Sequence, residues 1–239
     1  MKVVLVHGGW QGGWAWHMVA PLLWSAGHEV FTPTLRGLDE GDVDRASLTL
    51  GDLAGGLIQE IENRNPDDFV LVGHSGGGPV AQLVADRFGH RVRRIVFMSA
   101  WVLHDGESIL DVHTQPEAEA LRAKAARGLE NTITMDTGRW ASTFMQDATP
   151  GQLAATTGRL VPTPLGWFDE PIKLPRFFDL HLPASYVFLR HDNSAPKERY
   201  RAMAARLDHP LIVECDGSHE AMLTRPNAVA NALRCAIEL

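Results

Sequence analysis

The chain has 239 residues and a formal net charge of −7, from 22 Lys and Arg against 29 Asp and Glu. This acidic balance excludes nucleic acid and anionic membrane surfaces as main partners, because either would select a basic patch. Hydrophobic residues make up 45% and charged residues 21%, which is the composition of a folded globular chain and not of a disordered one.

Taken in chain order, short apolar runs alternate with segments of helical periodicity. The runs that predict buried strands are 3–6, 29–32, 69–72, 95–99, 186–189 and 211–214. Apolar side chains recur at helical spacing over 50–61, 80–88, 200–207 and 229–237. Such alternation predicts an α/β protein with a mostly parallel central sheet flanked by helices.

Residues 101–182 interrupt this alternation, and no convincing buried strand is found there. Helical patterns cover 117–127 and 138–146, and four prolines follow between 162 and 175. An insertion of this kind in a regular α/β pattern predicts a mainly helical cap over the sheet. We therefore expect one folded unit, with a core of residues 1–100 and 183–239 and a cap of 101–182.

The sharpest local motif is Gly73-His74-Ser75-Gly76-Gly77, a G-x-S-x-G sequence. A predicted strand leads directly into it and a predicted helix leads directly out, which is the context of a nucleophile elbow. The turn holds the serine in a strained conformation, and only glycine fits the close backbone approach on either side. Ser75 is therefore the candidate nucleophile.

A serine hydroxyl needs a base, and the base needs an orienting acid. Among the 11 histidines, His219 follows the last predicted strand, which places it at the same sheet edge as Ser75. Asp192 follows the penultimate strand and is the candidate acid, giving the order Ser, Asp, His. Asp105 is a second candidate for the acid, whereas Asp216 lies on the same short loop as His219 and is interpreted as a turn residue.

Acyl transfer also needs hydrogen-bond donors for the developing oxyanion. The Gly76 amide is one candidate, and the loop after the first strand supplies the other through Gly9, with Trp10 as an alternative. The glycines of this first loop do not match the G-x-G-x-x-G dinucleotide pattern. Histidine pairs and cysteine pairs at metal-ligand spacing are also missing, because Cys215 and Cys235 stand far apart. We therefore expect no cofactor and no metal.

With these residues in place, the chain resembles the α/β-hydrolases, and within them the group of plant methylesterases, salicylate-binding esterases and hydroxynitrile lyases. The resemblance lies in residues 4–16 (VLVHGGWQGGWAW), 70–75 (VLVGHS) and 189–196, and it covers the core but not the cap. It implies the α/β-hydrolase fold, with Ser75, His219 and Asp192 as the triad and the Gly9 and Gly76 amides as the oxyanion hole.

Two departures from the lyases of this group are informative. The lyases have threonine after the first-loop histidine and lysine after the catalytic histidine, whereas this chain has Gly8 and Glu220. Because a carboxylate there would repel cyanide, we expect a carboxylic ester hydrolase instead. A tailoring methylesterase or lactonase of a secondary metabolite, and a ligand-binding protein without catalysis, are the alternatives.

Large aromatic side chains in the cap suggest what the pocket accepts. The candidate pocket residues are Trp10, His74, Trp140, Phe144, Trp167 and Phe168. The alternative for the four aromatic residues of the cap is that they form the cap's own small core. No Lys or Arg except Arg190 stands beside Ser75, Asp192 or His219 in the sequence. This predicts an apolar pocket without a fixed cation. Such a pocket would favour neutral aromatic or medium-sized apolar esters. The longest apolar runs are too short to span a membrane, so we expect a cytoplasmic protein, as a monomer or homodimer, with a small-molecule ester as its partner.

Overall fold

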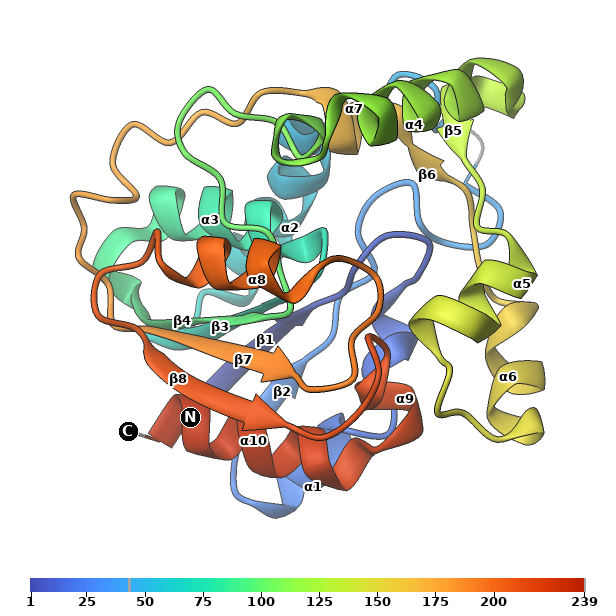
Figure 1. Ribbon diagram of the computed structural model, residues 1–239. Helices are drawn as coiled ribbons and strands as arrows, with labels where there is room; N and C mark the ends of the chain where they lie inside the picture. Colours follow the sequence, from blue (N-terminus) through green and yellow to red (C-terminus); the bar gives the residue numbers. More distant parts are fainter. Residues whose placement is uncertain (43, 239) are drawn as a thin grey trace.

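A computed structural model describes residues 1–42 and 44–238 of the chain. Six parallel strands form the central sheet (Figure 1). In spatial order they are β2 (Glu29–Phe31), β1 (Lys2–Val6), β3 (Phe69–His74), β4 (Val92–Met98), β7 (Ala184–Leu189) and β8 (Leu211–Cys215). All six predicted strands are thereby confirmed, with bounds that differ by three residues at most.

Helices cover both faces of the sheet, which explains why its central strands are apolar on both sides. One face carries α2 (Leu50–Arg64), α3 (Gly77–Phe88) and α8 (Lys197–Ala204), and the other carries α1 (Ala20–Ser25) and α10 (Pro226–Glu238), with the short α9 (Ala221–Thr224) beside it (Figure 1). Side chains of β1 alternate between the two cores: Val4 and Val6 pack toward α2 and α3, whereas Val3 and Leu5 pack toward α1 and α10.

The cap lies at the carboxyl edge of the sheet, as Figure 1 shows in green and yellow. Its elements are α4 (Gln115–Arg127), β5 (Thr132–Ile133), α5 (Thr137–Arg139), a π-helical turn over Trp140–Phe144, α6 (Pro150–Thr157), β6 (Thr163–Pro164) and α7 (Leu165–Asp169). Capping boxes at Thr114 and Thr149 start α4 and α6. Short 3₁₀ turns cover Gly13–Trp16, Gly89–Arg91, Leu110–Val112 and Leu129–Asn131.

The cap contains one feature that the sequence analysis missed. β5 and β6 pair as an antiparallel ribbon of two residues per strand. Strands this short, one of them ending in Pro164, carry no alternating pattern that the sequence could reveal, and the rest of the cap is mainly helical. Within the described residues, every helix is too short or too polar to cross a membrane.

Candidate active site

Ser75 occupies the turn between β3 and α3 with a φ of 53°. A side-chain carbon on Gly73 would lie 2.9 Å from the Gly77 carbonyl oxygen, and one on Gly77 would lie 2.5 Å from the His7 carbonyl oxygen. Both distances are shorter than any real contact, so the glycines two positions before and two after Ser75 are sterically required. The geometry is that of a strained elbow that raises the serine above the sheet edge.

His219 and Asp192 form a buried ion pair at the ends of β8 and β7. Asp192 Oδ2 lies 2.6 Å from His219 Nδ1, and both side chains are 2% exposed. Burial opposes the charge on each group, but their attraction outweighs it: the pKa of Asp192 lies below its ordinary value and the pKa of His219 lies above. Because Nδ1 is bonded to Asp192, Nε2 is the ring nitrogen left for Ser75, which lines the same pocket.

The hydroxyl groups of Ser194 and Tyr200, which the sequence did not point to, help to hold Asp192 in place. Ser194 donates its N–H and its hydroxyl to Asp192 Oδ1, at 2.8 and 2.6 Å, and its Oγ lies 2.7 Å from the Tyr200 hydroxyl. Burial, and then the charge of Asp192, raise the pKa of Tyr200 well above its ordinary value, so Tyr200 stays protonated. The Ser-Ala-Pro sequence after Asp192 was the only local signal of this support. By contrast, Asp105 is exposed and accepts the Leu174 N–H.

Two buried histidines, His74 and His7, fix the loops around Ser75, Asp192 and His219. His74 Nε2 lies 3.0 Å from the His219 carbonyl oxygen, so Nε2 carries a proton and donates it, and the two rings are 4.6 Å apart. His7 Nε2 accepts the Leu35 N–H while its Nδ1 donates to the Gly8 carbonyl. Burial lowers the pKa of His7 to about 4 and that of His74 well below its ordinary value. Both are therefore neutral positioning groups near pH 7.

The amides proposed for the oxyanion hole lie side by side. The Gly9 nitrogen is 3.7 Å from the position that a side-chain carbon of Gly76 would take. Within the described chain, neither amide N–H has an internal acceptor, whereas the Trp10 N–H donates to Thr163 Oγ1 at 2.7 Å. Because Trp10 is committed in this way, Gly9 and Gly76 are the free donors beside Ser75. Thr163 belongs to β6, so the cap helps to hold this loop in place.

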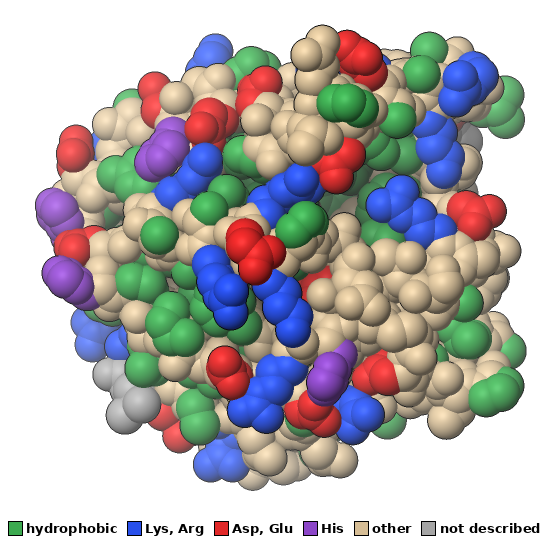
Figure 2. Space-filling model, in the orientation of Figure 1, with side chains coloured by type: hydrophobic (Ala, Val, Ile, Leu, Met, Phe, Trp, Pro, Cys, Tyr) green, Lys and Arg blue, Asp and Glu red, His purple; other side chains and the backbone are tan. Residues whose placement is uncertain are grey.

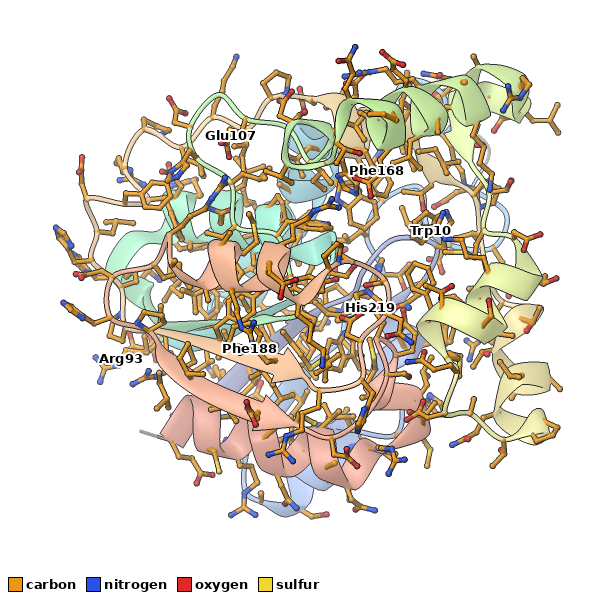
Figure 3. The ribbon with its side chains drawn as sticks, in the orientation of Figure 1. Trp10, Arg93, Glu107, Phe168, Phe188 and His219 are labelled. Atoms are coloured by element: carbon orange, nitrogen blue, oxygen red, sulfur yellow. The ribbon has the colours of Figure 1, made fainter. Side chains whose placement is uncertain are left out.

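A pocket of about 600 Å³, open mouth included, lies between the cap and the sheet edge. Figure 2 shows a hollow with hydrophobic side chains below α4, and Figure 3 shows Trp10 and His219 on either side of the space between cap and core. Its lining combines Ser75 and His219 with mainly apolar side chains from both parts: Trp10, Trp101, His113, Leu121, Lys124, Ile133, Thr134, Met135, Arg139, Phe144, Ser194 and Tyr200.

Four of the six predicted pocket residues lie behind this lining. Trp140 is fully buried and stacks on Phe144, and Trp167 donates its indole N–H to the Gly76 carbonyl. Phe168 packs against Trp10 (Figure 3), and His74 lies beneath His219. Only Trp10 and Phe144 of the predicted set reach the pocket.

The expectation of a pocket without a fixed cation is wrong. Lys124 of α4 and Arg139 of α5 both line the pocket. They are far from the triad in sequence, and the fold of the cap brings them to it. The expectation was based only on residues that are close to Ser75, Asp192 and His219 in the sequence. Such residues do not determine which side chains of the cap line the pocket.

A cluster of buried polar groups lies behind His219. Glu220 is 2% exposed, and a carboxylate oxygen of it lies within 4.8 Å of a nitrogen of His74 and a nitrogen of His219. Glu220 Oε2, His74 Nδ1 and the Gln11 amide have no hydrogen-bond partner within the described chain. Burial raises the pKa of Glu220 to about 7. Because Asp192 and the His219 carbonyl already hold the two histidines, we interpret the cluster as support for the triad and not as a metal site.

Comparison with known proteins agrees with this geometry. A family model described as the alpha/beta hydrolase family matches residues 3–232. The chain belongs to the alpha/beta hydrolase family. This alpha/beta hydrolase is 40% identical over 108 residues to a carbendazim-hydrolyzing esterase of Nocardioides, a match that covers 45% of each chain. It is 25% identical over 248 residues to salicylic acid-binding protein 2 of Nicotiana tabacum, covering 96% of this chain and 94% of that one.

A solved structure gives the same result. An extracellular alpha/beta-hydrolase from a Paenibacillus species, described as sharing structural and functional homology with the tobacco protein, superposes with a TM-score of 0.91 at 28% identity, over 99% of this chain and 98% of that one. The match to the Nocardioides esterase covers 45% of that protein. A putative chloroplastic methylesterase of Arabidopsis thaliana is 24% identical over 97% of this chain, and this match covers 55% of the methylesterase. Each of these two matches therefore spans only about half of the curated relative.

Proposed function

We propose that this alpha/beta hydrolase is a serine carboxylic ester hydrolase that works through an acyl-enzyme. The observation that supports it most is that three features lie around one pocket, which Ser75 and His219 line. They are the strained elbow at Ser75, the buried Asp192–His219 pair, and the Gly9 and Gly76 amides, which have no internal acceptor among the described residues. The esterases and methylesterases among the relatives support the same reaction class.

In the first half-reaction, the Ser75 oxygen attacks the ester carbonyl carbon while His219 Nε2 takes the hydroxyl proton. The carbonyl oxygen becomes an oxyanion, which accepts hydrogen bonds from the Gly9 and Gly76 N–H groups. Each such donor lowers the barrier by about 3 to 4 kcal/mol. The helix start at Gly76 adds a positive dipole end at this place.

The oxyanion then collapses, the bond between the carbonyl carbon and the alcohol oxygen breaks, and His219 returns its proton to the leaving alcohol. A water molecule attacks the acyl-enzyme with the same base, and releases the acid and Ser75. Asp192 stabilises the imidazolium that forms in each step. Ser194 fixes the carboxylate by hydrogen bonds, and the Tyr200 hydroxyl in turn bonds to Ser194 Oγ. No metal or cofactor takes part in the reaction that we propose.

The portion of the substrate next to the scissile carbonyl is aromatic or apolar. Trp10, Trp101 and Phe144 line the pocket together with Ser75, and a charged group buried among them without a partner would cost several kcal/mol. A methylesterase fits within this proposal as a special case, supported by the relatives named methylesterases. An acidic side chain, Glu220, stands next to the base where a cation would be needed to hold cyanide, and this favours hydrolysis over cyanide chemistry.

The test is hydrolysis of an activated aryl ester by wild type and by Ser75→Ala. The variant should lose at least 10³-fold in kcat while its melting temperature stays within a few degrees, since the hydroxyl makes no internal hydrogen bond in the described chain. A matched control is Ser47→Ala, on an exposed loop. Hydrolysis by Ser75→Ala at the wild-type rate would refute the proposal, and a folded wild type without esterase activity would favour the binding-protein alternative.

A further inference from the structure

Two cations lie on the cap side of the catalytic pocket. Lys124 is half-buried in the third turn of α4, and Arg139 is exposed at the end of α5 with its guanidinium 5.8 Å from the Phe144 ring. Both line the same pocket as Ser75 and His219. In Figure 2, side chains of Lys and Arg border the hollow below α4.

Among the described residues, no acidic side chain forms an ion pair with either cation, Lys124 or Arg139. No Asp or Glu of this part of the chain lines the pocket. Asp136, three residues before Arg139, uses its carboxylate to accept the Arg139 backbone N–H at the start of α5. By contrast, Arg122 pairs with Asp169 and Arg199 pairs with Glu117.

The other titratable groups of the pocket do not offset this charge. His113 bonds to the Ile109 carbonyl, and burial, followed by nearby charges that include Arg199 and Arg139, holds its pKa below the ordinary value. Tyr200 is protonated and His219 is paired with Asp192. Although the chain has a net charge of −7, its pocket presents two positive charges that no acidic side chain of the lining offsets. A positive local field of this kind attracts anions.

We infer that the substrate is an ester whose end remote from the scissile carbonyl carries an anionic group, which Lys124 and Arg139 bind at the pocket mouth. This inference rests on the proposed ester hydrolase function and names its substrate class. The guanidinium of Arg139 suits a carboxylate, phosphate or sulfate, since its planar donors match two oxygens at once. The apolar wall between the cations and Ser75 suits the linking aliphatic or aromatic part.

The experiment compares matched aryl esters that differ only at the remote end. One series is the mono-aryl esters of dicarboxylic acids with four to ten carbons, and the other is the same esters with the free carboxylate capped as a methyl amide. A third arm replaces the carboxylate by a phosphate and so distinguishes the two anions. Wild type should favour the charged ester over its capped partner by at least tenfold in kcat/KM at one chain length, about 1.4 kcal/mol.

The variants are Lys124→Met, Arg139→Gln and the double substitution. Each single change should lower the charged-to-capped ratio about threefold, and the double change should bring it close to one. Salt should lower the wild-type ratio and not that of the double variant. Arg127→Gln, on an exposed position of the same helix α4, is the matched control and should keep the wild-type ratio.

The outcomes separate the two claims. Hydrolysis of capped and charged esters at equal rates by wild type, or an unchanged ratio in the double variant, would overturn the inference and leave the ester hydrolase function intact. Hydrolysis of neither series by wild type would overturn both. A ratio that falls equally in Arg127→Gln would show a general effect of net charge, and would also overturn a site at Lys124 and Arg139.

Discussion

Glu220 offers a quantitative test of the electrostatics behind the triad. Its carboxyl group is buried, faces His219, His74 and Gln11, and lacks a partner for Oε2 within the described residues. Burial raises its pKa from 4.5 to about 7, against the opposing influence of His219. The folded protein thus keeps this proton at pH values where the unfolded chain has lost it.

The sign of the effect on stability follows from proton binding. Between pH 4.5 and about 7 the folded state binds more protons at this site, so its contribution to the free energy of unfolding falls as pH rises and is constant above pH 7. With about 1.4 kcal/mol per pKa unit, the loss across this window is about 3 kcal/mol. Glu220→Gln keeps the shape of the protonated side chain and removes the titration.

Urea unfolding at pH 5 and pH 8 measures the difference. At pH 5 the variant and wild type should differ by less than about 1 kcal/mol, and at pH 8 the variant should be more stable by up to about 3 kcal/mol. The exposed Glu29→Gln is the control, with the same small difference at both pH values. If Glu220→Gln changes stability equally at pH 5 and pH 8, the account of this buried carboxyl is wrong.

Three further predictions concern the triad and its elbow. Asp192→Asn should lower kcat by about 10⁴, because the amide favours the wrong tautomer of His219, while Asp105→Asn keeps activity within about twofold; the reverse result would move the acid to Asp105. kcat/KM should rise with pH and level off, with a midpoint above 6.5, because Asp192 raises the pKa of His219 by more than burial lowers it. Glu220→Gln should lower that midpoint, since the charge of Glu220 also raises the pKa of His219. A flat profile from about pH 5 to 9 would exclude a histidine base. Gly77→Ala should lower the free energy of unfolding in urea by about 3 kcal/mol or more, because its methyl group would overlap the His7 carbonyl oxygen. The methyl group of Gly76→Ala would lie 3.5 Å from Trp167, so this variant should lose less than about 1 kcal/mol. Equal losses would contradict the packing of the elbow.

The sheet and the elbow could be predicted because their signals are local. Each buried strand is a short apolar run. Glycine is required at positions 73 and 77 because a side-chain carbon there would overlap backbone oxygens of the same turn or of the loop after β1. The positions of Asp192 and His219 followed from strand order, since parallel strands bring their carboxyl ends to one edge. These inferences needed no knowledge of side-chain packing.

The pocket wall could not be predicted in this way. Trp140 and Trp167 are as aromatic as Phe144, yet they face the cores of the protein because of a π-helical turn and the packing of α7 on the elbow. Lys124 and Arg139 reach the pocket only through the way the cap folds over the sheet edge, which the periodicity of its separate helices does not specify. Ser194 donates a hydrogen bond to Asp192, and Tyr200 acts through its hydrogen bond to Ser194, neither of which is specified by sequence spacing.

The most direct measurement for the central claim is covalent labelling with a fluorophosphonate, followed by mapping of the adduct by mass spectrometry. We expect one adduct, on Ser75, that forms at least 10²-fold more slowly in His219→Ala because the hydroxyl loses its base. An unlabelled folded protein, or an adduct on any residue other than Ser75, would contradict this expectation.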